Sequence, residues 1–444
     1  MVSAAREQWS SRTGFVLAAV GSAVGLGNMW RFSYLTAENG GAAFVVLYLL
    51  VTMVVGLPLL LAELVVGRGA QRSPIPALAD FGGPRWRALG AVFVAAGFLI
   101  LSYYSVIAGW TVRYALIVLS GGLDSDASDR FGDIATGWDA FGYHLLFMAV
   151  TVAVVAGGVK GGIERAAMLL MPTLFAIVAG LAAYAVTLQG SGPGYAYYLS
   201  VDLSELMHWS VLKDAAGQAF FSLSLGMGAM LTFASYLGRR EHLPNESLVI
   251  AGADIAVAFV AGLVVFPLIF ALGLEEKVGG STVGALFITL PQAFAEMGAV
   301  GRAVGGLFFV ALVVGALTSA ISLLEVVVSS AIDVLGWSRL RSAVFAGAAI
   351  ALLGAPSAYS TEVLGVADGI ANNLFLLGGG LALSLFVGWF VRDPIAEVRA
   401  GAEGVRWFFL WRTLLRFAVP AFLGFVLWYA VPETAASVAA LFGS

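Results

Sequence analysis

The sequence predicts an all-helical polytopic membrane protein, and three observations lead to this class. Of the 444 residues, 60% are hydrophobic and 11% are charged, whereas charged residues make up roughly a quarter of a soluble domain. Many apolar segments exceed the roughly 20 residues that cross a bilayer as a helix, and they are too long for the strands of a membrane barrel, which need about 10 alternating residues. The first apolar segment is interrupted by the run G-S-A-V-G-L-G-N-M-W-R at residues 21–31.

Apolar runs between charged or Gly/Pro-rich stretches divide the chain into eleven predicted transmembrane helices. The predicted ranges are 14–36, 41–67, 88–119, 140–156, 163–188, 214–238, 244–273, 302–335, 341–354, 362–391 and 410–430.

The first predicted helix contains a charged residue and several glycines that are unfavourable in contact with lipid. An unpaired charge such as Arg31 near mid-bilayer costs roughly 2.5 to 3.5 kcal/mol on insertion scales. Non-helical backbone is tolerated at that depth only where it lines a cavity. Gly21 and Gly25 could alternatively form a small-xxx-small packing motif. The stretch is therefore interpreted as a site inside the membrane, with helix packing as the alternative.

The sixth helix carries a matching interruption, S-L-S-L-G-M-G-A at residues 222–229. Two glycine-interrupted segments at corresponding positions indicate a secondary transporter with inverted repeats and a binding site at mid-membrane. The chain 1–444 is then one transmembrane domain. Its first repeat is 14–190 (helices 1–5), its second, inverted repeat is 214–392 (helices 6–10), and helix 11 at 410–430 follows.

The charged residues divide between the two sides of the membrane in this arrangement of helices, and this division predicts how the chain is oriented. Lys and Arg dominate loops on one side, and by the positive-inside rule that side is cytoplasmic. We expect a multi-pass protein of the cell (plasma) membrane with a cytoplasmic N-terminus and, after an odd number of spans, an extracellular C-terminus. The basic residues are Arg6, Arg12, Arg68, Arg72, Arg85, Arg87, Lys160, Arg165, Arg239, Arg240, Arg339, Arg341, Arg392, Arg399, Arg406 and Arg412. The acidic residues of the other side are Asp124, Asp126, Asp129, Asp133, Asp202, Glu205, Glu275 and Glu276.

The composition argues against catalysis. The chain has no cysteine and three histidines, and no nucleophile stands with a base at a known motif spacing. Neither an enzyme nor a nucleic-acid-binding protein is expected, and the oligomeric state is left open.

The interrupted segments resemble the neurotransmitter:sodium symporters. The residues that carry the resemblance are R-E-Q-W-S-S-R-T-G-F at 6–15, the run at 21–32, E-N-G-G-A-A-F at 38–44, Q-A-F-F-S-L-S-L-G-M-G-A at 218–229 and G-A-L-T-S-A-I-S at 315–322. Their prokaryotic amino-acid transporter branch, which includes the bacterial leucine transporter and the eleven-helix multi-hydrophobic amino acid transporters, is the most similar. The resemblance implies a 5+5 inverted-repeat fold with helices 1 and 6 unwound, and sodium-driven uptake by alternating access.

The resemblance also implies two sodium sites, built from oxygen ligands that suit a hard cation. The first uses the Ala23 carbonyl, the Asn28 side chain, Ser222 and Asp254, completed by the substrate carboxylate. The second uses the carbonyls of Gly21, Val24 and Gly315 with the hydroxyls of Thr318 and Ser319. From the residues alone, Thr318 and Ser319 are more typical of hydroxyls that bond a carbonyl one turn back.

Asp254 is a lone carboxylate in an apolar run, and intramembrane carboxylates are functional by default. Chloride-dependent relatives hold an anion with a tyrosine, a glutamine and two hydroxyl residues. Tyr48, Gln218 and Ser222 match three of them, but the fourth position is Ala258. We therefore predict that Asp254 supplies the negative charge and that no chloride is required; the alternative is a protonated aspartate bonded to a neighbouring helix.

Two further acidic residues lie in predicted helices. The resemblance implies that Glu63 supports the broken sixth helix by bonding its free amides. Glu325 has no role that the sequence assigns beyond a structural polar contact.

The substrate expected from the resemblance is an amino acid zwitterion. Its carboxylate would meet the amides of Leu26 and Gly27 and the hydroxyl of Tyr104, and its amino group the carbonyls of Ala23, Phe221 and Ser222 with the hydroxyl of Ser224. Its side chain would enter a pocket formed by Ile100, Tyr104, Phe221, Met227, Ser319 and Leu323.

That pocket is apolar, and Met227 between two glycines is adaptable in shape. Broad specificity for hydrophobic and aromatic L-amino acids, tryptophan included, is predicted. Biogenic amines fit less well, because relatives that carry them use an aspartate where Gly25 stands.

Charged and aromatic residues at the two ends match the gates of the family. Arg31 and Asp368 would form the extracellular gate. Arg6 and Asp333, supported by Trp9 and Tyr236, would form the cytoplasmic gate. Gly162 and Pro172 resemble the motif that lets the cytoplasmic end of helix five unwind.

Two other functions remain open from the sequence. One is a proton-coupled amino-acid carrier in which Asp254 or Glu63 titrates. The other is a non-transporting amino-acid sensor, which would bind its ligand without accumulating it.

Overall fold

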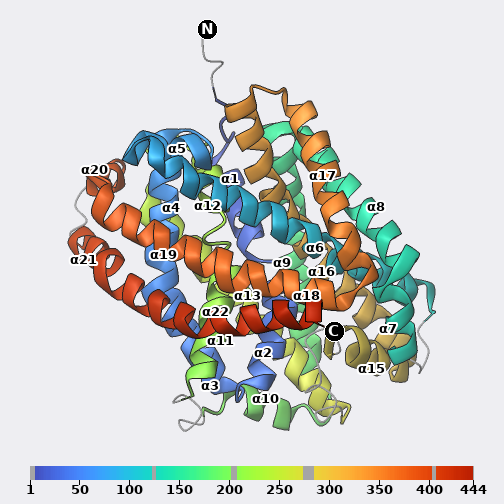
Figure 1. The fold of residues 1–444 in the computed structure, drawn as a ribbon. Coiled ribbons are helices and arrows are strands. Elements are labelled where there is room, and N and C mark those ends of the chain that lie inside the picture. Colours follow the sequence, from blue (N-terminus) through green and yellow to red (C-terminus); the bar gives the residue numbers. More distant parts are fainter. Residues whose placement is uncertain (1–5, 123–126, 202–207, 274–284, 403–406, 444) are drawn as a thin grey trace.

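The computed structural model describes residues 6–122, 127–201, 208–273, 285–402 and 407–443, and every regular element in these ranges is a helix (Figure 1). The predicted all-helical class is confirmed for them. Several charged residues used for the orientation lie outside the described residues: Asp124, Asp126, Asp202, Glu205, Glu275, Glu276 and Arg406.

Among the described residues, nine helices are long and apolar enough to cross a membrane, or ten when the bent first pair is one span. The predicted sixth helix is split into two short pieces and is not among them. Eleven spans therefore stays a prediction.

The first half of the chain follows the predicted order. Its helices are α1 (Arg12–Ala23), η1 (Gly27–Arg31), α2 (Phe32–Glu38), α3 (Ala42–Val51), η2 (Thr52–Gly56), α4 (Leu57–Ala70), α5 (Pro74–Gly82), η3 (Pro84–Trp86), α6 (Arg87–Ser120), α7 (Ala127–Ala135), α8 (Gly137–Ala156), η4 (Val159–Glu164), α9 (Arg165–Val186) and α10 (Gly192–Leu199).

The second half contains the other interrupted helix and the longest helix. Its elements are α11 (Trp209–Ser222), α12 (Ala229–Ala234), α13 (Leu243–Ala271), η7 (Ala285–Thr289), α15 (Leu290–Glu296), α16 (Gly298–Leu335), α17 (Arg339–Tyr359), α18 (Thr361–Ile370), η8 (Ala371–Leu376), α19 (Leu377–Leu385), η9 (Phe386–Phe390), α20 (Pro394–Arg399), α21 (Phe408–Thr413), η10 (Leu414–Ala418) and α22 (Val419–Gly443).

Two predicted helix ends are wrong. The ninth helix, predicted to end at 354, continues to Tyr359, and the last, predicted to end at 430, continues to Gly443. Pro356 and Pro432 lie inside these helices. In a soluble protein, a proline inside a helix usually kinks or ends that helix. In a membrane helix it is tolerated, because neighbouring groups bond the backbone carbonyl that loses its partner.

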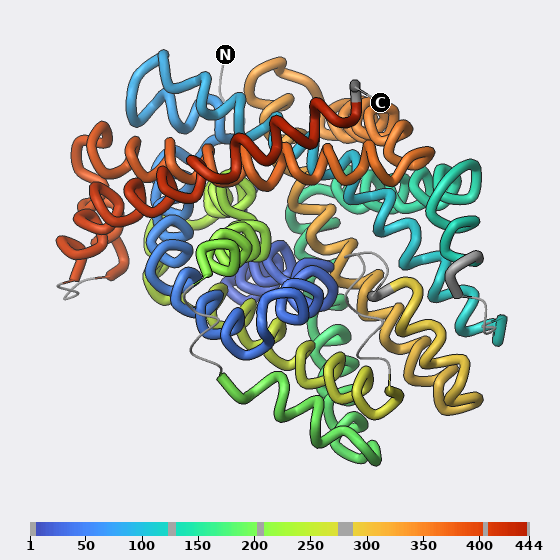
Figure 2. Tube along the Cα trace, turned by 60° about the horizontal axis from the view of Figure 1, so that its bottom comes forward, coloured from blue at the N-terminus to red at the C-terminus, as the bar shows by residue number. Residues whose placement is uncertain are grey.

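The interrupted helices lie at the centre of the molecule. Helix α1 packs against α16, α9 and α13, and the long helices α16 and α6 pack against each other along one side. Helices α19 and α22 run side by side across one face in both views (Figures 1 and 2). The two helix breaks are thus enclosed by other helices.

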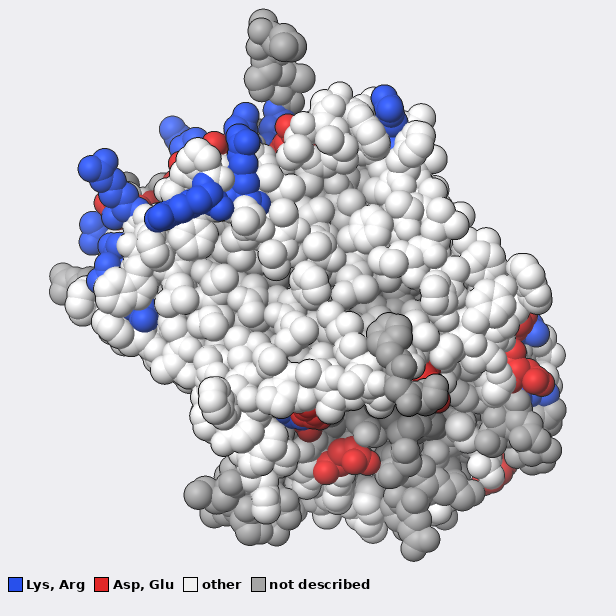
Figure 3. All heavy atoms as spheres, in the orientation of Figure 1, with Lys and Arg blue, Asp and Glu red and all other residues white. Residues whose placement is uncertain are grey.

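Charged side chains gather at opposite ends of the molecule. In the view of Figure 3, Lys and Arg cluster at the top, around α5 and α20, and Asp and Glu dominate the lower part. Between them lies a broad surface without charge, as expected of a protein surrounded by lipid.

Candidate transport site

The first helix breaks where its glycines predict. Helix α1 ends at Ala23, and the path bends by 47° before it continues as η1 and α2. Gly25 donates its backbone N–H to Asn28 Oδ1 (3.0 Å), and Leu26 donates its own to the Tyr104 hydroxyl (3.4 Å). A Cβ at Gly25 would stand 2.3 Å from Ser319 Oγ and 3.1 Å from the Tyr104 hydroxyl, so a larger residue would require these side chains to move.

The second break lies between α11 and α12. Ser224, Gly226 and Gly228 have positive φ values of 54°, 76° and 72°, a backbone conformation that glycine adopts without strain. Glu63, fully buried on α4, accepts hydrogen bonds from the backbone N–H groups of Gly226 (2.9 Å) and Leu231 (3.2 Å). The carboxylate thereby satisfies two amides that the broken helix leaves free.

Asp254 on α13 faces the first break. Its carboxylate accepts hydrogen bonds from Asn28 Nδ2 (2.7 Å), Ser222 Oγ (2.6 Å) and the Tyr48 hydroxyl (2.8 Å). The structure thus brings together the three side chains predicted for the first sodium site, and Ala23 lies beside them at the end of α1.

Two of the residues compared with a chloride site contact the same carboxyl group. Tyr48 and Ser222 both donate to Asp254. Gln218 donates to the Gly27 carbonyl (2.8 Å), and its buried Oε1 has no hydrogen-bond partner. Ala258 is buried and offers no polar atom. The Asp254 carboxyl group therefore lies where Tyr48 and Ser222 meet.

The residues predicted for the second sodium site lie where α1 meets α16. Ser319 donates across the interface to the carbonyls of Gly21 (3.4 Å) and Ser22 (3.3 Å). Thr318 instead donates to Gly315 (3.0 Å) and Val314 (3.2 Å) on its own helix, the local alternative that its sequence context favours. Val24 caps the end of α1.

A small cavity lies between the two breaks. It is lined by Ser22, Ala23, Gly25, Gly27, Ile100, Tyr104, Phe221, Ser222, Ser224, Met227, Ser319 and Leu323. Of the predicted substrate residues, only Leu26 is missing from this lining, and its N–H points to Tyr104 beside it. Ser22 was not predicted.

A second, larger cavity lies at the end of the molecule predicted to be extracellular. Tyr104 and Phe221 line both cavities and separate them. Arg31 and Asp368 line the outer one and form an ion pair at 3.8 Å, and the Arg31 guanidinium lies 5.2 Å from the centre of the Phe221 ring. The predicted extracellular gate residues are therefore together and closed over the first cavity.

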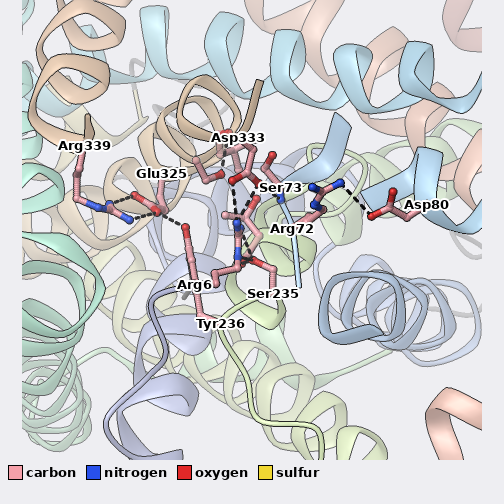
Figure 4. A network of polar contacts seen from close by, with 12 residues as sticks. Arg6, Arg72, Ser73, Asp80, Ser235, Tyr236, Glu325, Asp333 and Arg339 are labelled. Atoms are coloured by element: carbon pink, nitrogen blue, oxygen red, sulfur yellow. Dashed lines mark hydrogen bonds and ion pairs between the residues drawn. The ribbon is translucent and has the colours of Figure 1, made fainter. Parts of the chain in front are cut away.

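The predicted cytoplasmic gate is a larger network (Figure 4). Arg6 donates to both oxygens of Asp333 (3.1 and 2.9 Å) and to Ser235 Oγ (2.7 Å), and lies over the Tyr236 ring at 4.7 Å. Trp9 donates its indole N–H to the Phe233 carbonyl (2.9 Å).

Glu325 extends this network, a role that its sequence did not indicate. It is fully buried, accepts from the Tyr236 hydroxyl (2.5 Å), and pairs with Arg339 (2.8 Å). Arg339 also reaches Glu7 at 3.1 Å. A lone acid in a helix carries no local signal for partners that are so distant in the sequence.

The segment between Gly162 and Pro172 starts in η4, a wider π-helical turn, and continues in α9. Glu164 in this turn accepts from the Ser10 N–H (2.9 Å) and from the hydroxyls of Ser10 (2.5 Å) and Ser11 (3.0 Å). The start of α1 is therefore attached directly to the end of helix five that the motif predicts to unwind.

Comparisons with known proteins agree with this architecture. The structure is similar to the crystal structure of MhsT in complex with L-phenylalanine, with a TM-score of 0.88 and 42% identity, covering 96% of this chain and all of that one. The uncharacterized sodium-dependent transporter YhdH of Bacillus subtilis is 36% identical over 93% of this chain and 95% of its own length. An uncharacterized sodium-dependent transporter of Haemophilus influenzae is 31% identical over 94% and 96%.

The family model covers nearly all of the chain, matching residues 6–129 and 130–438. Together with the two broken helices and the cavity between them, this match defines a sodium-dependent membrane transporter and not an enzyme. The chain belongs to the sodium:neurotransmitter symporter family.

Proposed function

We propose that this transporter takes up hydrophobic and aromatic L-amino acids together with two sodium ions, without chloride. The observation that carries the proposal is the cavity between the two helix breaks, whose lining combines backbone polar groups with Ile100, Met227 and Leu323. The relative MhsT was crystallised with L-phenylalanine, which supports an aromatic substrate class.

The polar groups of the cavity suit a zwitterion. The amides of Leu26 and Gly27 follow the break in α1 and, with Tyr104, would bind the carboxylate. The carbonyls at the end of α1 and of α11 would bind the amino group, together with Ser224. Asp254 is bonded to Ser222, which lines the cavity, and it would serve a sodium ion.

Chloride independence is supported by the surroundings of Asp254. The side-chain oxygens of Asp254 already accept hydrogen bonds from Asn28, Ser222 and Tyr48. A chloride ion beside it would meet like-charge repulsion in a region of low dielectric. The carboxylate therefore replaces the anion as the partner of the first sodium.

Alternating access would use the two gate networks in turn, in two inverted repeats at 14–190 and 214–392 followed by helix 11. We also propose that the basic end in Figure 3 is cytoplasmic. Two sodium charges moving inward with a zwitterion gain about 4.6 kcal/mol per 100 mV, at roughly 2.3 per charge. This energy supports a concentration ratio of about a thousandfold or more.

The test is uptake of radiolabelled tryptophan and leucine into proteoliposomes with an imposed inside-negative potential. Concentrative uptake that needs sodium, proceeds without chloride and is lost in Asp254→Ala is expected. Accumulation that ignores sodium but follows a pH gradient would establish a proton-coupled carrier. Saturable binding without accumulation would establish a sensor.

A further inference from the structure

Two arginines lie side by side where one membrane-spanning helix ends and the next begins. The span Thr361–Phe390 ends in η9, and the span Phe408–Leu441 begins with α21 and η10. Arg412 on α21 and Arg416 on η10 both reach toward η9. Helix α21 packs beside α20, where the basic side chains gather (Figures 1 and 3). The arginine pair therefore lies near one surface of the membrane.

The two guanidinium groups converge on one carbonyl oxygen. Arg416 Nε donates to the Gly388 carbonyl (2.7 Å), and Arg412 Nε donates to the same oxygen (3.4 Å). Arg412 Nη2 also donates to the Val391 carbonyl (3.2 Å). These carbonyls lie at the end of η9, where a helix leaves acceptors without partners and favours positive charge. The end of η9 therefore holds two like charges close together.

No carboxylate forms an ion pair with either arginine among the residues that the structure describes. The acidic residues at α20 are bonded elsewhere. Asp393 accepts the backbone N–H of Ala396 (3.0 Å), and Glu397 pairs with the buried Arg68 (2.8 Å). A guanidinium group has five N–H donors in a planar fork that matches a phosphate group. Because each arginine of the pair gives at most two bonds to the protein, donors remain for an anion.

Exposed aromatic rings border the arginine pair. The Arg416 guanidinium lies 5.1 Å from the centre of the Trp389 ring. Phe417 meets the Trp389 ring edge-on, with ring centres 5.4 Å apart. Trp389 is 52% exposed and Phe417 57% exposed. Tryptophan is typical of the membrane interface, where its ring lies at the level of the lipid headgroups. The arginine pair therefore has an apolar surface beside it on which an acyl chain can pack.

We propose that Arg412 and Arg416 bind the phosphate of an anionic phospholipid whose acyl chains lie against Trp389 and Phe417. Basic pockets between helices at the cytoplasmic end of membrane proteins bind acidic headgroups in this way. A free phosphate ion would use the arginines but not the exposed rings. The proposal goes beyond the proposed function, because it depends on the membrane-spanning arrangement and not on the substrate or the coupling ion.

The test is native mass spectrometry of the purified full chain with equal amounts of phosphatidylglycerol and phosphatidylcholine that carry the same acyl chains. Wild-type protein is expected to retain phosphatidylglycerol about tenfold more, because each of two arginines attracts the anionic headgroup. Equal retention of the two lipids would overturn the proposal without any variant. Displacement of the bound lipid by millimolar inorganic phosphate would also overturn it, since the site would then bind the anion alone.

In the double variant with Arg412→Gln and Arg416→Gln, the preference for phosphatidylglycerol should fall to about one. The matched control carries Arg239→Gln and Arg240→Gln, which remove two adjacent, exposed arginines from the side predicted to be basic, and its preference should stay near that of the wild type. An equal fall in both double variants would mean that the basic end attracts anionic lipid without a specific site, and would refute the proposal.

A purely structural role of the arginine pair predicts a different result. As caps of η9 alone, the arginines would stabilise the protein equally in both lipids. Their double variant would then unfold at a lower temperature and keep the preference for phosphatidylglycerol, which would contradict the proposal.

A second variant leaves the arginine pair in place. Trp389→Ala should lower the retention of phosphatidylglycerol about threefold, the effect of one aromatic contact. Trp138→Ala is its control, because Trp138 is an exposed tryptophan (79%) on α8, remote from η9 in the sequence. Equal retention in the two variants would refute the placement of the acyl chains. Every one of these results is independent of sodium-driven uptake, so failure of this site and failure of the proposed function are distinguishable.

Discussion

The two proposed gates differ in how their residues are joined. The cytoplasmic gate joins Arg6 and Asp333 by two hydrogen bonds of 3.1 and 2.9 Å within a network that continues through Tyr236 and Glu325. The extracellular gate has one ion pair at 3.8 Å, and Arg31 Nη1 is buried without a hydrogen-bond partner. Closure depends on directional polar bonds at the inner end and on an aromatic cover, Phe221, at the outer end.

This difference indicates which opening is the harder step. Hydrogen bonds to charged groups contribute about 1.5 to 3 kcal/mol each, and exposed ion pairs about 0 to 1. Opening the inner gate breaks several hydrogen bonds to charged groups. Opening the outer gate breaks one exposed ion pair and moves the Phe221 ring. An outward-facing form should therefore be reached more easily, unless ligands stabilise the inner opening.

The largest effect is expected from Arg6→Ala. The substitution removes the bonds to Asp333 and Ser235. Because water replaces part of this interaction at a partly exposed pair, the net loss is expected to equal that of one hydrogen bond to a charged group, about 1.5 to 3 kcal/mol, and should raise inward opening by about ten- to a hundredfold. A third cavity, beside the proposed cytoplasmic gate, is lined by Arg6, Asp333 and Ser329. The chain has no cysteine, so Ser329→Cys can report opening through its rate of labelling by a maleimide.

Arg72→Ala is the matched control for this variant. Arg72 and Asp80 form a neighbouring pair at 3.4 Å with side chains 55% and 47% exposed (Figure 4). Its loss should change labelling less than about twofold. Equal acceleration in both variants would remove the claim that the inner network carries the closure.

Phe221→Ala should have the next largest effect. Without the ring, the cavity between the helix breaks would join the second cavity. Bound substrate should then dissociate about tenfold faster in sodium, in line with the loss of a partly buried aromatic side chain. Phe221→Leu keeps an apolar cover and should give a smaller change. A pulse–chase measurement of bound radiolabelled amino acid checks both, and equal rates for Ala and Leu would contradict the aromatic cover.

Asp368→Asn should increase the same dissociation rate by only about two- to fivefold, because an exposed pair contributes about 0.2 to 1 kcal/mol. Asp368 is 37% exposed, so added salt should shrink the difference between variant and wild type. An effect as large as that of Phe221→Ala would show that the ion pair, and not the ring, closes the outer end.

The smallest effect is expected at the far end of α22. Lys213 on α11 pairs with Glu433 (2.6 Å), and Trp209 stacks on Tyr429 with ring centres 4.4 Å apart. Glu433→Gln should change the dissociation rate of bound substrate less than about twofold. Tyr429→Ala should change it more, since an aromatic pair contributes about 0.5 to 1.5 kcal/mol. The reverse order would mean that the charge, and not the stacking, ties α22 to the outer part of helix six.

The sequence predicted the parts of the site that local chemistry determines. Glycines at membrane depth identified both breaks, and the isolated carboxylate of Asp254 identified the centre of the polar cluster with Asn28, Ser222 and Tyr48. The residues that were missed, Ser22 and Ser322, are small and polar, and a serine in a membrane helix ordinarily bonds its own backbone. Only the structure shows that their hydroxyls meet across two helices.

The fold was predicted less well wherever distant contacts decide it. Pro432 indicates the end of a helix near Val431 to Thr434. Helix α22 nevertheless continues through this segment, and the Thr434 hydroxyl accepts a hydrogen bond from Asn373 Nδ2 (2.9 Å). The short helices α5, α10, α15 and α20 lack the length and periodicity of a span, so no apolar pattern distinguishes them from loops.

The carboxylate of Glu63 has a consequence for how tightly a substrate can be held. Fixing the backbone of one residue costs about 1 to 2 kcal/mol of conformational entropy. Because Glu63 already holds Gly226 and Leu231 in place, this ordering is completed when the protein folds and not when a ligand arrives. The pocket is thereby preorganised, and more of the interaction energy with a substrate remains available to drive closure.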